Sequence, residues 1–535
     1  MSEAGGSSEY HDRIQKLKLI EEAGKQAYPD AYQRTHFATE ALENGEKSEM
    51  REIEAIVAEP RPATIKLAGR LMSFRQHGKL SFSHLQDFSG MIQICFMQDF
   101  IGDEKYKFLR KIDVADHVGV EGELFRTRHG EITLLVSDYT LLSKTLRPLP
   151  EKWHGIKDKE IMYRQRYLDT TMNRETLDRF IFRSKLTQLL RQFYWKEGFI
   201  ELETPVLENV SSGATASPFT THHNALDIDV YLRIAAGELW QKMAVVGGFE
   251  KTFEVAKVFR NEGIDPSHLQ EFTMIEHYVA YWNYEDNMAF TERMFEYFLK
   301  EMLGSLKVKI KDREGQEVEV DFTGPWKRVT FRDLVLGDCG IDILEYDNAD
   351  DLRARIKKEG IQIEEMDKLG YGGLVDHLYK KVSRPKLIQP TFVINHPVDM
   401  KPLARKNDKD PRVADAFQLL VNTWEVINAY SEIVDPRDQR SRFEAQSLAK
   451  AGGDEEAMMM NEEYLLAMEH GMPCMSGWGM GIDRLVTLLT EQDNLKDSVL
   501  FPLLRPLEEV TKKEQKALEK AKKILKKAGS NAEKN

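Results

Sequence analysis

The stretch Phe259-Arg260-Asn261-Glu262 decides how the sequence is interpreted, together with the residues that follow it as far as His268 and Glu271-Phe272. The run Phe-Glu-Val-Ala-Lys-Val-Phe over Phe253–Phe259 predicts a half-buried strand. A polar loop of turn residues follows, and Phe272–Tyr278 predicts a second strand. The stretch therefore lies at the end of a predicted hairpin.

The end of this hairpin is suited to a nucleoside triphosphate. Arg260 and Glu262 are two residues apart, so their side chains point to one face of an extended chain. A guanidinium can fork onto a phosphate, and the ring of Phe272 can stack on a base. The alternative is an ordinary hairpin with a surface ion pair, and this pattern alone does not separate the two.

Length and composition indicate a globular protein of several domains. A chain of 535 residues is too long for one core, so two or three domains are expected. The net charge of −13 argues against a uniformly positive surface, although a local basic face is enough to bind a nucleic acid. Cys95, Cys339 and Cys474 form no Cys-x-x-Cys pair, which excludes a zinc ribbon and favours a reducing compartment. We find no signal-peptide pattern and no run of about eighteen apolar residues, so we expect a soluble, cytoplasmic protein without a membrane segment.

The N-terminal part predicts a small barrel preceded by a helical extension. Residues 1–58 form the extension, whose charged helices would pack on the next domain or touch RNA. Residues 59–145 contain five short strands with glycine-containing turns, a count and spacing typical of an oligonucleotide-binding (OB-fold) barrel. The predicted strands are 65–72, 80–85, 91–96, 117–124 and 132–136.

Aromatic and basic residues are interleaved on this barrel, as on sheets that bind single-stranded nucleotides. The aromatic residues are Phe82, Phe96 and Phe125, and the arginines are Arg70, Arg75, Arg126 and Arg128. The alternative is that the aromatic rings form the core of the barrel.

The remainder predicts an α+β domain over residues 171–506, built on a mainly antiparallel sheet and preceded by a polar linker, 146–170. Residues 305–390 are interpreted as an insertion without visible chemistry. Residues 507–535 predict a basic helical tail that is either solvated or attracted to RNA. The helices predicted in the α+β domain are 176–197, 284–304 and 454–470.

Carboxylates gather in two further segments. In Trp424–Glu432, a period of two places Glu425 on one face of a strand and Asn428, Tyr430 and Glu432 on the other. Two acidic faces beside a triphosphate suggest one carboxylate for Mg²⁺ and one for a cation. Glu238 adds a third carboxylate at the end of a predicted strand.

The segment Gly477–Arg484 contains three glycines at alternate positions and ends in an arginine at the start of a predicted helix. The Gly-x-Gly-x-x-Gly pattern is not satisfied and no βαβ unit surrounds the segment, which argues against a dinucleotide fold. The glycines fit a close approach of the backbone to a ligand, with Arg484 as a clamp on a phosphate or a base. A Walker lysine loop does not occur, which excludes P-loop chemistry.

Together these segments resemble the class II lysyl-tRNA synthetases over roughly residues 10–506. Three signatures carry the resemblance: a helix and strand ending at Pro205, the Phe-Arg-Asn-Glu stretch with its loop to Phe272, and Gly-Met-Gly-Ile-Asp-Arg ending at Arg484. Pro402–Pro411 is similar to the linker of the subgroup. The resemblance implies an OB-fold anticodon-binding domain followed by a class II antiparallel-sheet catalytic domain.

The implied activity is the ATP-dependent ligation of L-lysine to tRNA(Lys) through a lysyl-adenylate, with Mg²⁺ and in a homodimer. Arg260 would stabilise the reacting α-phosphate, Glu262 would contact adenine or the ATP-bound loop, and Arg484 would stack on adenine opposite Phe272 and reach the γ-phosphate. These two arginines and Glu262 form the implied catalytic set. The residues implied to bind ATP are Arg260, Glu262, His268, Phe272, Glu425 and Arg484.

The resemblance also implies two recognition sites. Glu238, Glu432 and Tyr278 would surround the ε-ammonium of lysine, while Gly213, Asn428 and Tyr430 would line the amino-acid site. On the barrel, Phe82 would stack on the central anticodon uridine. The residues implied to contact the edges of that base are Arg75, Gln93 and Glu131.

Two positions depart from the family pattern. Glu425 is the implied metal ligand, and seven residues earlier Gln418 stands where the family usually has a second metal-binding glutamate. A neutral amide is a weaker Mg²⁺ ligand, so the number of metal ions stays open. Leu269 replaces a polar residue of the hairpin loop and would remove one contact to ATP.

Two other functions stay open from the sequence. A sister synthetase for aspartate or asparagine would need a basic or amide-reading pocket, whereas this chain gathers glutamates. A catalytically inactive RNA-binding protein of the same fold would not need Arg260, Arg484 and Glu425, which are retained.

Overall fold

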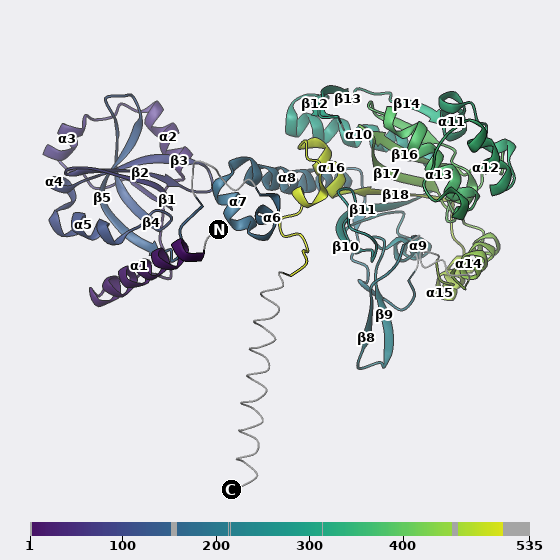
Figure 1. The fold of residues 1–535 in the computed structure, drawn as a ribbon, viewed down its shortest axis with the longest axis horizontal. Coiled ribbons are helices and arrows are strands. Elements are labelled where there is room, and N and C mark those ends of the chain that lie inside the picture. Colours follow the sequence, from purple (N-terminus) through teal and green to yellow (C-terminus); the bar gives the residue numbers. More distant parts are fainter. Residues whose placement is uncertain are drawn as a thin grey trace, which may run out of the picture. The chain divides into compact units, whose positions relative to one another are not determined.

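The computed structural model describes residues 3–150, 158–211, 213–214, 216–312, 314–451 and 458–506. The chain divides into two compact units, Met1–Lys157 and Asp158–Asn535 (Figure 1). The predicted basic tail, 507–535, lies outside the described residues. Among those that are described, no helix has the length and apolar character needed to cross a membrane.

The first unit contains a closed five-stranded barrel, which confirms the predicted OB-fold. Its strands are β1 (Ile65–His77), β2 (Leu80–Gln86), β3 (Met91–Met97), β4 (His117–Arg126) and β5 (Ile132–Ser143). They follow the order β1-β2-β3-β5-β4, in which β3 and β5 are parallel and the other neighbours antiparallel. Two short helices, α4 (Gln98–Ile101) and α5 (Asp103–Phe108), connect β3 to β4.

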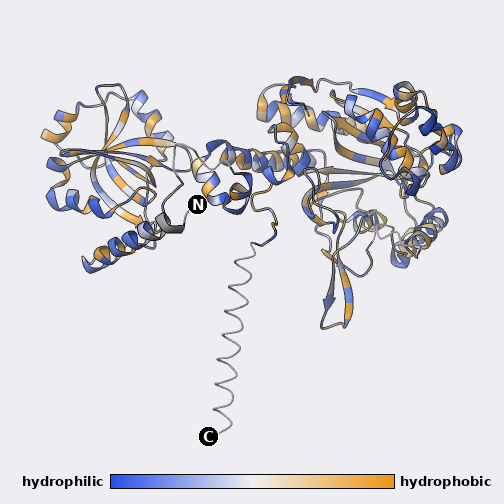
Figure 2. Cartoon of the chain, viewed as in Figure 1, coloured by the Kyte–Doolittle hydropathy of each residue, from blue (hydrophilic) through white to orange (hydrophobic). Residues whose placement is uncertain are grey.

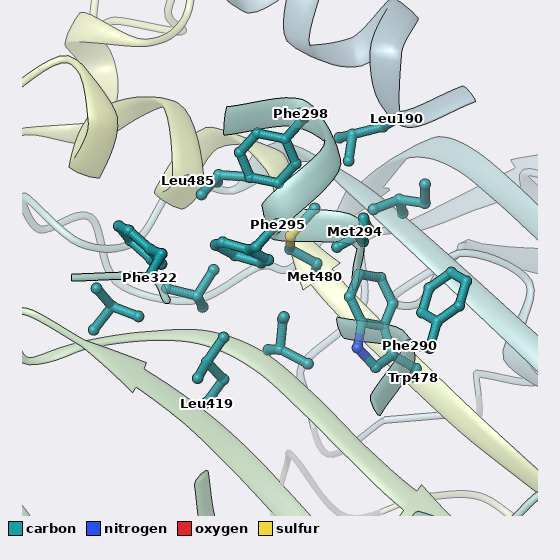
Figure 3. Close-up of a cluster of buried hydrophobic side chains, with 14 of the residues drawn as sticks. Leu190, Phe290, Met294, Phe295, Phe298, Phe322, Leu419, Trp478, Met480 and Leu485 are labelled. Carbon is teal, nitrogen blue, oxygen red and sulfur yellow. The ribbon is translucent and has the colours of Figure 1, made fainter. Parts of the chain in front are cut away.

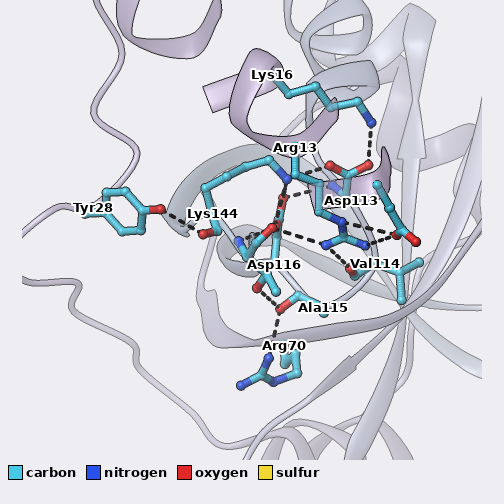
Figure 4. A network of polar contacts seen from close by, with 11 residues as sticks. Arg13, Lys16, Tyr28, Arg70, Asp113, Val114, Ala115, Asp116 and Lys144 are labelled. Carbon is cyan, nitrogen blue, oxygen red and sulfur yellow. Dashed lines mark hydrogen bonds and ion pairs between the residues drawn. The ribbon is translucent and has the colours of Figure 1, made fainter. Parts of the chain in front are cut away.

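The N-terminal helices pack on this barrel. They are α1 (Glu3–Glu22), α2 (Ala38–Lys47) and α3 (Ile53–Ala58). Ile20 of α1 is fully buried in the same core as the barrel strands. A polar network adds to this contact (Figure 4): Arg13 donates to the carbonyl oxygens of Val114 (3.1 Å) and Thr145 (3.2 Å). In that network the buried ammonium of Lys144 lies 2.9 Å from the Asp116 carboxylate.

The second unit is built on an eight-stranded sheet, ordered β14-β15-β16-β17-β18-β11-β10-β6. The two outermost pairs, β14 with β15 and β10 with β6, are parallel, and all other neighbours are antiparallel. The strands are β6 (Ile200–Glu201), β10 (Lys251–Phe259), β11 (Glu271–Ala280), β14 (Lys327–Thr330), β15 (Thr391–Ile394), β16 (Ala416–Val421), β17 (Trp424–Ser431) and β18 (Met475–Gly481). This sheet confirms the predicted class of fold.

Two helices, α8 (Arg174–Lys196) and α10 (Tyr284–Leu303), cover one face of the sheet. Figure 3 shows this core, where Trp478 and Met480 of β18 meet Phe290 and Phe295 of α10. The indole nitrogen of Trp478 donates to Thr291 at 2.9 Å, so its polar atom is satisfied inside the core. In Figure 2 the strands of the large sheet carry many hydrophobic residues, whereas α1 is largely hydrophilic.

The remaining elements surround this sheet. Further helices are α6 (Lys159–Arg164), α7 (Arg166–Met172), α9 (Glu238–Val246), α11 (Phe331–Cys339), α12 (Ala349–Lys358), α13 (Tyr371–Val382), α14 (Pro436–Ala451), α15 (Glu462–Glu469) and α16 (Ile482–Leu489). Smaller sheets are formed by β7 (Leu207–Glu208), β8 (Thr220–His223) and β9 (Ile228–Leu232), and by β12 (Lys307–Lys311) and β13 (Glu317–Asp321). The predicted insertion contributes β14 to the main sheet and builds a core of its own around α11, α12 and α13.

Two predicted elements differ from the structure. The helix expected over 454–470 is α15, which begins only at Glu462, where Asn461 caps it by accepting from the Tyr464 backbone at 3.0 Å. Glu238 does not end a strand but begins α9, directly after Gly237, whose φ of +72° favours glycine.

Candidate active site

Three glycines of β18 form the floor of the site. Side chains alternate along a strand, so Trp478 and Met480 enter the core and Gly477, Gly479 and Gly481 face the other side. Gly477 is paired with Tyr278 of β11. A Cβ atom at this position would lie 2.2 Å from Glu432 Oε1 and 2.5 Å from the Tyr278 ring, so only glycine fits.

Two cavities lie above this floor, with volumes of about 220 and 180 Å³. Both are lined by Arg260, Met274, Asn428 and Gly479, so they adjoin. Arg260 is held at this junction because its Nε donates to the Ile234 carbonyl oxygen at 3.2 Å. A ligand in one cavity can therefore meet a ligand in the other beside a fixed guanidinium.

The second cavity brings together every residue expected to bind ATP: Arg260, Glu262, His268, Phe272, Glu425 and Arg484. The Arg260 guanidinium lies 5.4 Å from the centre of the Phe272 ring. Arg484 Nη1 donates to the Glu425 carbonyl oxygen at 3.1 Å, which holds this side chain against β17. Two arginines and one aromatic ring thus line a cavity of suitable chemistry for a nucleotide.

A β-bulge corrects the expected placement of Glu425. Leu419 is paired with Ile427 and Leu420 with Glu425, so the register skips Val426. The extra residue turns Glu425 onto the same face as Asn428, not the opposite face that a period of two predicted. Glu425 and Asn428 accordingly line the same cavity.

Burial alone would raise the pKa of the Glu425 carboxyl, but nearby Arg484, Lys401 and Arg384 hold this pKa below its usual value. The group is therefore an anion at neutral pH, with cations of the chain around it.

Two carboxylates, Glu238 and Glu276, line the first cavity. Tyr278 and Tyr430 line it too, and the Tyr430 hydroxyl donates to Glu238 Oε1 at 2.9 Å. Gly213 and Asn428, also expected at the amino-acid site, lie in the same wall. The pKa of Glu276 is raised to about 7, mainly by burial and to a smaller extent by the negative charge of Glu238.

Lys242 of α9, which the sequence analysis did not single out, bridges two of the expected carboxylates. Its Nζ lies 2.7 Å from Glu238 Oε1 and 2.6 Å from Glu432 Oε2. Glu432 is 1% exposed and lies behind the cavity wall. Its Oε1 atom lies over Gly477 and accepts no hydrogen bond from any described residue. Burial raises the pKa of Glu432 to about 8, against the opposing effect of Lys242.

Comparison with known proteins places this geometry in a family. Residues 158–505 match the family model of class II tRNA synthetases (D, K and N), and residues 65–142 match that of the OB-fold nucleic acid binding domain. A lysine–tRNA ligase of Thermosipho africanus is 45% identical over 499 residues, covering 92% of this chain and 95% of the relative. This chain belongs to the class II lysyl-tRNA synthetases.

Other members of the lysyl-tRNA synthetase family match over similar lengths. The lysine–tRNA ligase of Fervidobacterium nodosum is 43% identical and covers 97% of this chain and 98% of its own. That of Aquifex aeolicus is 47% identical, over 84% of this chain and 74% of its own. The class II resemblance inferred from the three signatures is thereby confirmed.

The two residues expected to hold Mg²⁺ differ in how well they fit that ion. Mg²⁺ usually binds through one or two carboxylates together with substrate phosphates and water. Glu425 fits this role, because no described residue forms a hydrogen bond or ion pair with its carboxylate. Gln418 supplies no charge, and its Oε1 lies 3.2 Å from His396 Nε2. Within the described ranges no three Asp, Glu, His or Cys side chains form a metal-binding group.

The barrel presents the residues that are expected to bind the anticodon on one face. Strand pairing aligns Arg75 with Phe82 and His84 with Gln93. Phe82 is half-buried and Arg75 exposed, while Gln93 Nε2 donates to the Glu131 carboxylate. The other two aromatic candidates belong to the interior, where Phe96 is 1% and Phe125 3% exposed. Phe96 and Phe125 therefore belong to the core of the barrel, which was the alternative to a role in binding nucleotides.

Three charged residues of the site were missed from the sequence. Glu276 lies two residues before Tyr278 on β11, so the period of two places both on one face. Lys242 lies four residues after Glu238, the spacing of neighbours on a helix. Lys401 also lines the first cavity, and only its position before Pro402 and close to the subgroup linker could have drawn notice to it.

Proposed function

We propose that this chain joins L-lysine to tRNA(Lys) in two steps, through a lysyl-adenylate formed with ATP. One observation carries the choice of amino acid. Glu238, Glu276 and Glu432 gather three carboxylates, and one ammonium, that of Lys242, pairs with Glu238 and Glu432. When all three carboxyls are ionised they exceed this ammonium by two negative charges, and L-lysine brings two ammonium groups, at Cα and at Cε.

The charged groups suggest how the substrate is oriented. Glu276 lies close enough to Arg260 for that cation to lower its pKa, so it marks the end nearest the junction of the cavities. We assign the α-ammonium to Glu276 and the ε-ammonium to Glu238, with Glu432 and Lys242 behind it. The lysine carboxylate then lies at Arg260, where the two cavities meet.

Adenylation needs no base from the protein, because the lysine carboxylate is already a nucleophile. One carboxylate oxygen attacks the α-phosphorus, the bond to the leaving pyrophosphate breaks, and Arg260 stabilises charge on the α-phosphate oxygens. Phe272 and Arg484 would enclose adenine, while Glu262 and His268 contact the base and the outer phosphates. Mg²⁺, when bound at Glu425, supplies positive charge to these phosphates.

The second step would transfer the lysyl group to the 3′-hydroxyl of the terminal adenosine of the tRNA, with AMP as the leaving group. The anticodon would bind the barrel, where Phe82 offers a stacking surface and Arg75, Gln93 and Glu131 offer polar contacts. We further propose cytoplasmic location, which agrees with three unpaired cysteines.

A homodimer is part of the proposal. Large apolar side chains are exposed near the end of α8 and along the segment after it: Trp195 (56%), Ile200 (43%), Val206 (42%) and Leu207 (48%). Exposed apolar patches of this kind commonly mark protein–protein contacts. Sedimentation equilibrium should give a two-chain mass at micromolar concentration, and a monomer throughout would contradict the proposal.

An amino-acid screen tests the substrate. Among the twenty amino acids, L-lysine should support ATP–pyrophosphate exchange best, by a factor on the order of 10⁴ over neutral side chains, which would leave the carboxylates unpaired. Exchange driven by aspartate or asparagine would indicate a sister synthetase. No exchange with any amino acid would favour an inactive RNA-binding protein.

Lysine binding should strengthen as pH rises from 6 to 8. The pKa of Glu276 is raised to about 7 and that of Glu432 to about 8, so both carboxyls are partly protonated near neutrality. A bound ammonium favours the ionised carboxylates, lowers both pKa values and releases protons. The dissociation constant should therefore fall by about tenfold between pH 7 and pH 8. Titration calorimetry in two buffers of different ionisation enthalpy measures the released proton, and weaker binding at higher pH would contradict this account.

A further inference from the structure

Lys401 is a buried cation without a carboxylate partner. It follows a short 3-10 turn, Val398–Met400, and is 9% exposed. Its Nζ donates to Asn428 Oδ1 at 2.7 Å. In the described part of the chain no carboxylate lies within 4 Å of this ammonium, and no other side chain accepts from it. Two of its three N–H groups are thus left for a ligand or for water.

The position of Lys401 gives the first cavity two ends of opposite charge. Lys401, Arg260 and Asn428 line this cavity, and Asn428 and Arg260 also line the neighbouring one. The ammonium therefore lies at the end where the cavities meet, away from the carboxylates gathered around Lys242. A cationic amino acid in this cavity would direct its carboxylate to the positive end.

We propose that Lys401 binds the α-carboxylate of the substrate together with Arg260, and so fixes the oxygen that attacks the α-phosphate. This inference rests on the proposed function. A buried ammonium without an anionic partner destabilises the free protein, and a bound carboxylate would satisfy both charges. Burial lowers the pKa of Lys401, and Glu425 and Asp376 oppose this effect from a longer range.

The experiment is a binding cycle with two ligands and two proteins. L-Lysine carries the carboxylate, and L-lysinamide has a neutral amide there and keeps the ε-ammonium. Titration calorimetry without ATP compares the wild-type chain with Lys401→Met. L-Lysine should bind the variant about 10- to 100-fold more weakly, and lysinamide should change by less than about twofold. Lys409→Met, an exposed lysine of the same segment, is the matched control and should change neither.

Thermal unfolding separates binding from folding. Removing a buried unpaired charge should leave the melting temperature of the free variant unchanged or raised, while the increase caused by L-lysine should shrink. Lys401→Gln, which keeps a donor for Asn428, serves as a second variant if Lys401→Met does not fold.

Several outcomes would contradict the inference. If both ligands bound the variant equally more weakly, Lys401 would have a structural role. If L-lysine bound the variant unchanged, Lys401 would not contact the α-carboxylate. Weaker ATP binding with unchanged L-lysine binding would mean that the ammonium meets a phosphate. If the wild-type chain bound no L-lysine, the proposed function would fail first, and the inference with it.

Discussion

Arg260→Ala should slow lysine-dependent pyrophosphate exchange by about a thousandfold or more, the effect of removing an arginine that stabilises charge on a transferring phosphoryl group. Arg260 lies where the two cavities meet and is held there by the Ile234 carbonyl oxygen. The loss should appear mainly in kcat, because charge on the α-phosphate oxygens is greatest in the transition state.

Two variants make this result specific. Arg260→Lys keeps the charge but not the planar fork, so it should recover only part of the rate. Arg437→Ala removes an exposed arginine that pairs with Asp435 and should leave exchange unchanged. If Arg260→Ala lowered only the affinity for ATP and kept kcat, Arg260 would bind the ground state and not the reacting phosphate.

Glu238→Gln should raise the KM for lysine by on the order of 10² to 10³, the cost of leaving a buried charge without its partner. Glu238 lines the cavity directly and accepts from both Lys242 and Tyr430. The amide would leave one negative charge fewer for the two ammonium groups of lysine. ATP affinity should change little, because Glu238 does not line the second cavity.

The same substitution at Glu432 serves as a comparison for Glu238→Gln. Glu432→Gln should also damage lysine-dependent exchange far more than ATP binding, but less than Glu238→Gln, because Glu432 lies behind the wall and is paired with Lys242. Glu301→Gln, on the exposed side of α10, is the control. Equal losses of lysine and ATP affinity in Glu238→Gln would indicate a general collapse of the site and contradict the assignment.

Local patterns predicted much of the fold and many of the residues that line the second cavity. The hairpin of β10 and β11 and the glycine-rich β18 follow from strand-forming runs and turn residues within one segment, so the residues near them could be placed. The face of Glu425 could not be predicted, because a bulge depends on the register with the neighbouring strand. One extra residue at Val426 reverses the side of the sheet on which Glu425 lies.

The ion pairs of the site were harder to predict than its carboxylates. A sequence shows that glutamates are present but not which cation of the chain lies among them. The contact between Lys242 and Glu432 joins positions 190 residues apart, brought together only by the packing of α9 on the sheet. Such pairs require the three-dimensional structure.

The glycine floor of β18 has a consequence for inhibitor design. A compound that rests on the main chain of this strand depends on the absence of side chains there. At Gly477 any replacement adds atoms where Tyr278 and Glu432 already are, and at Gly479 a new Cβ would lie 3.3 Å from Glu276. A compound that contacts the main chain at Gly477 would therefore meet a surface that substitution can hardly change.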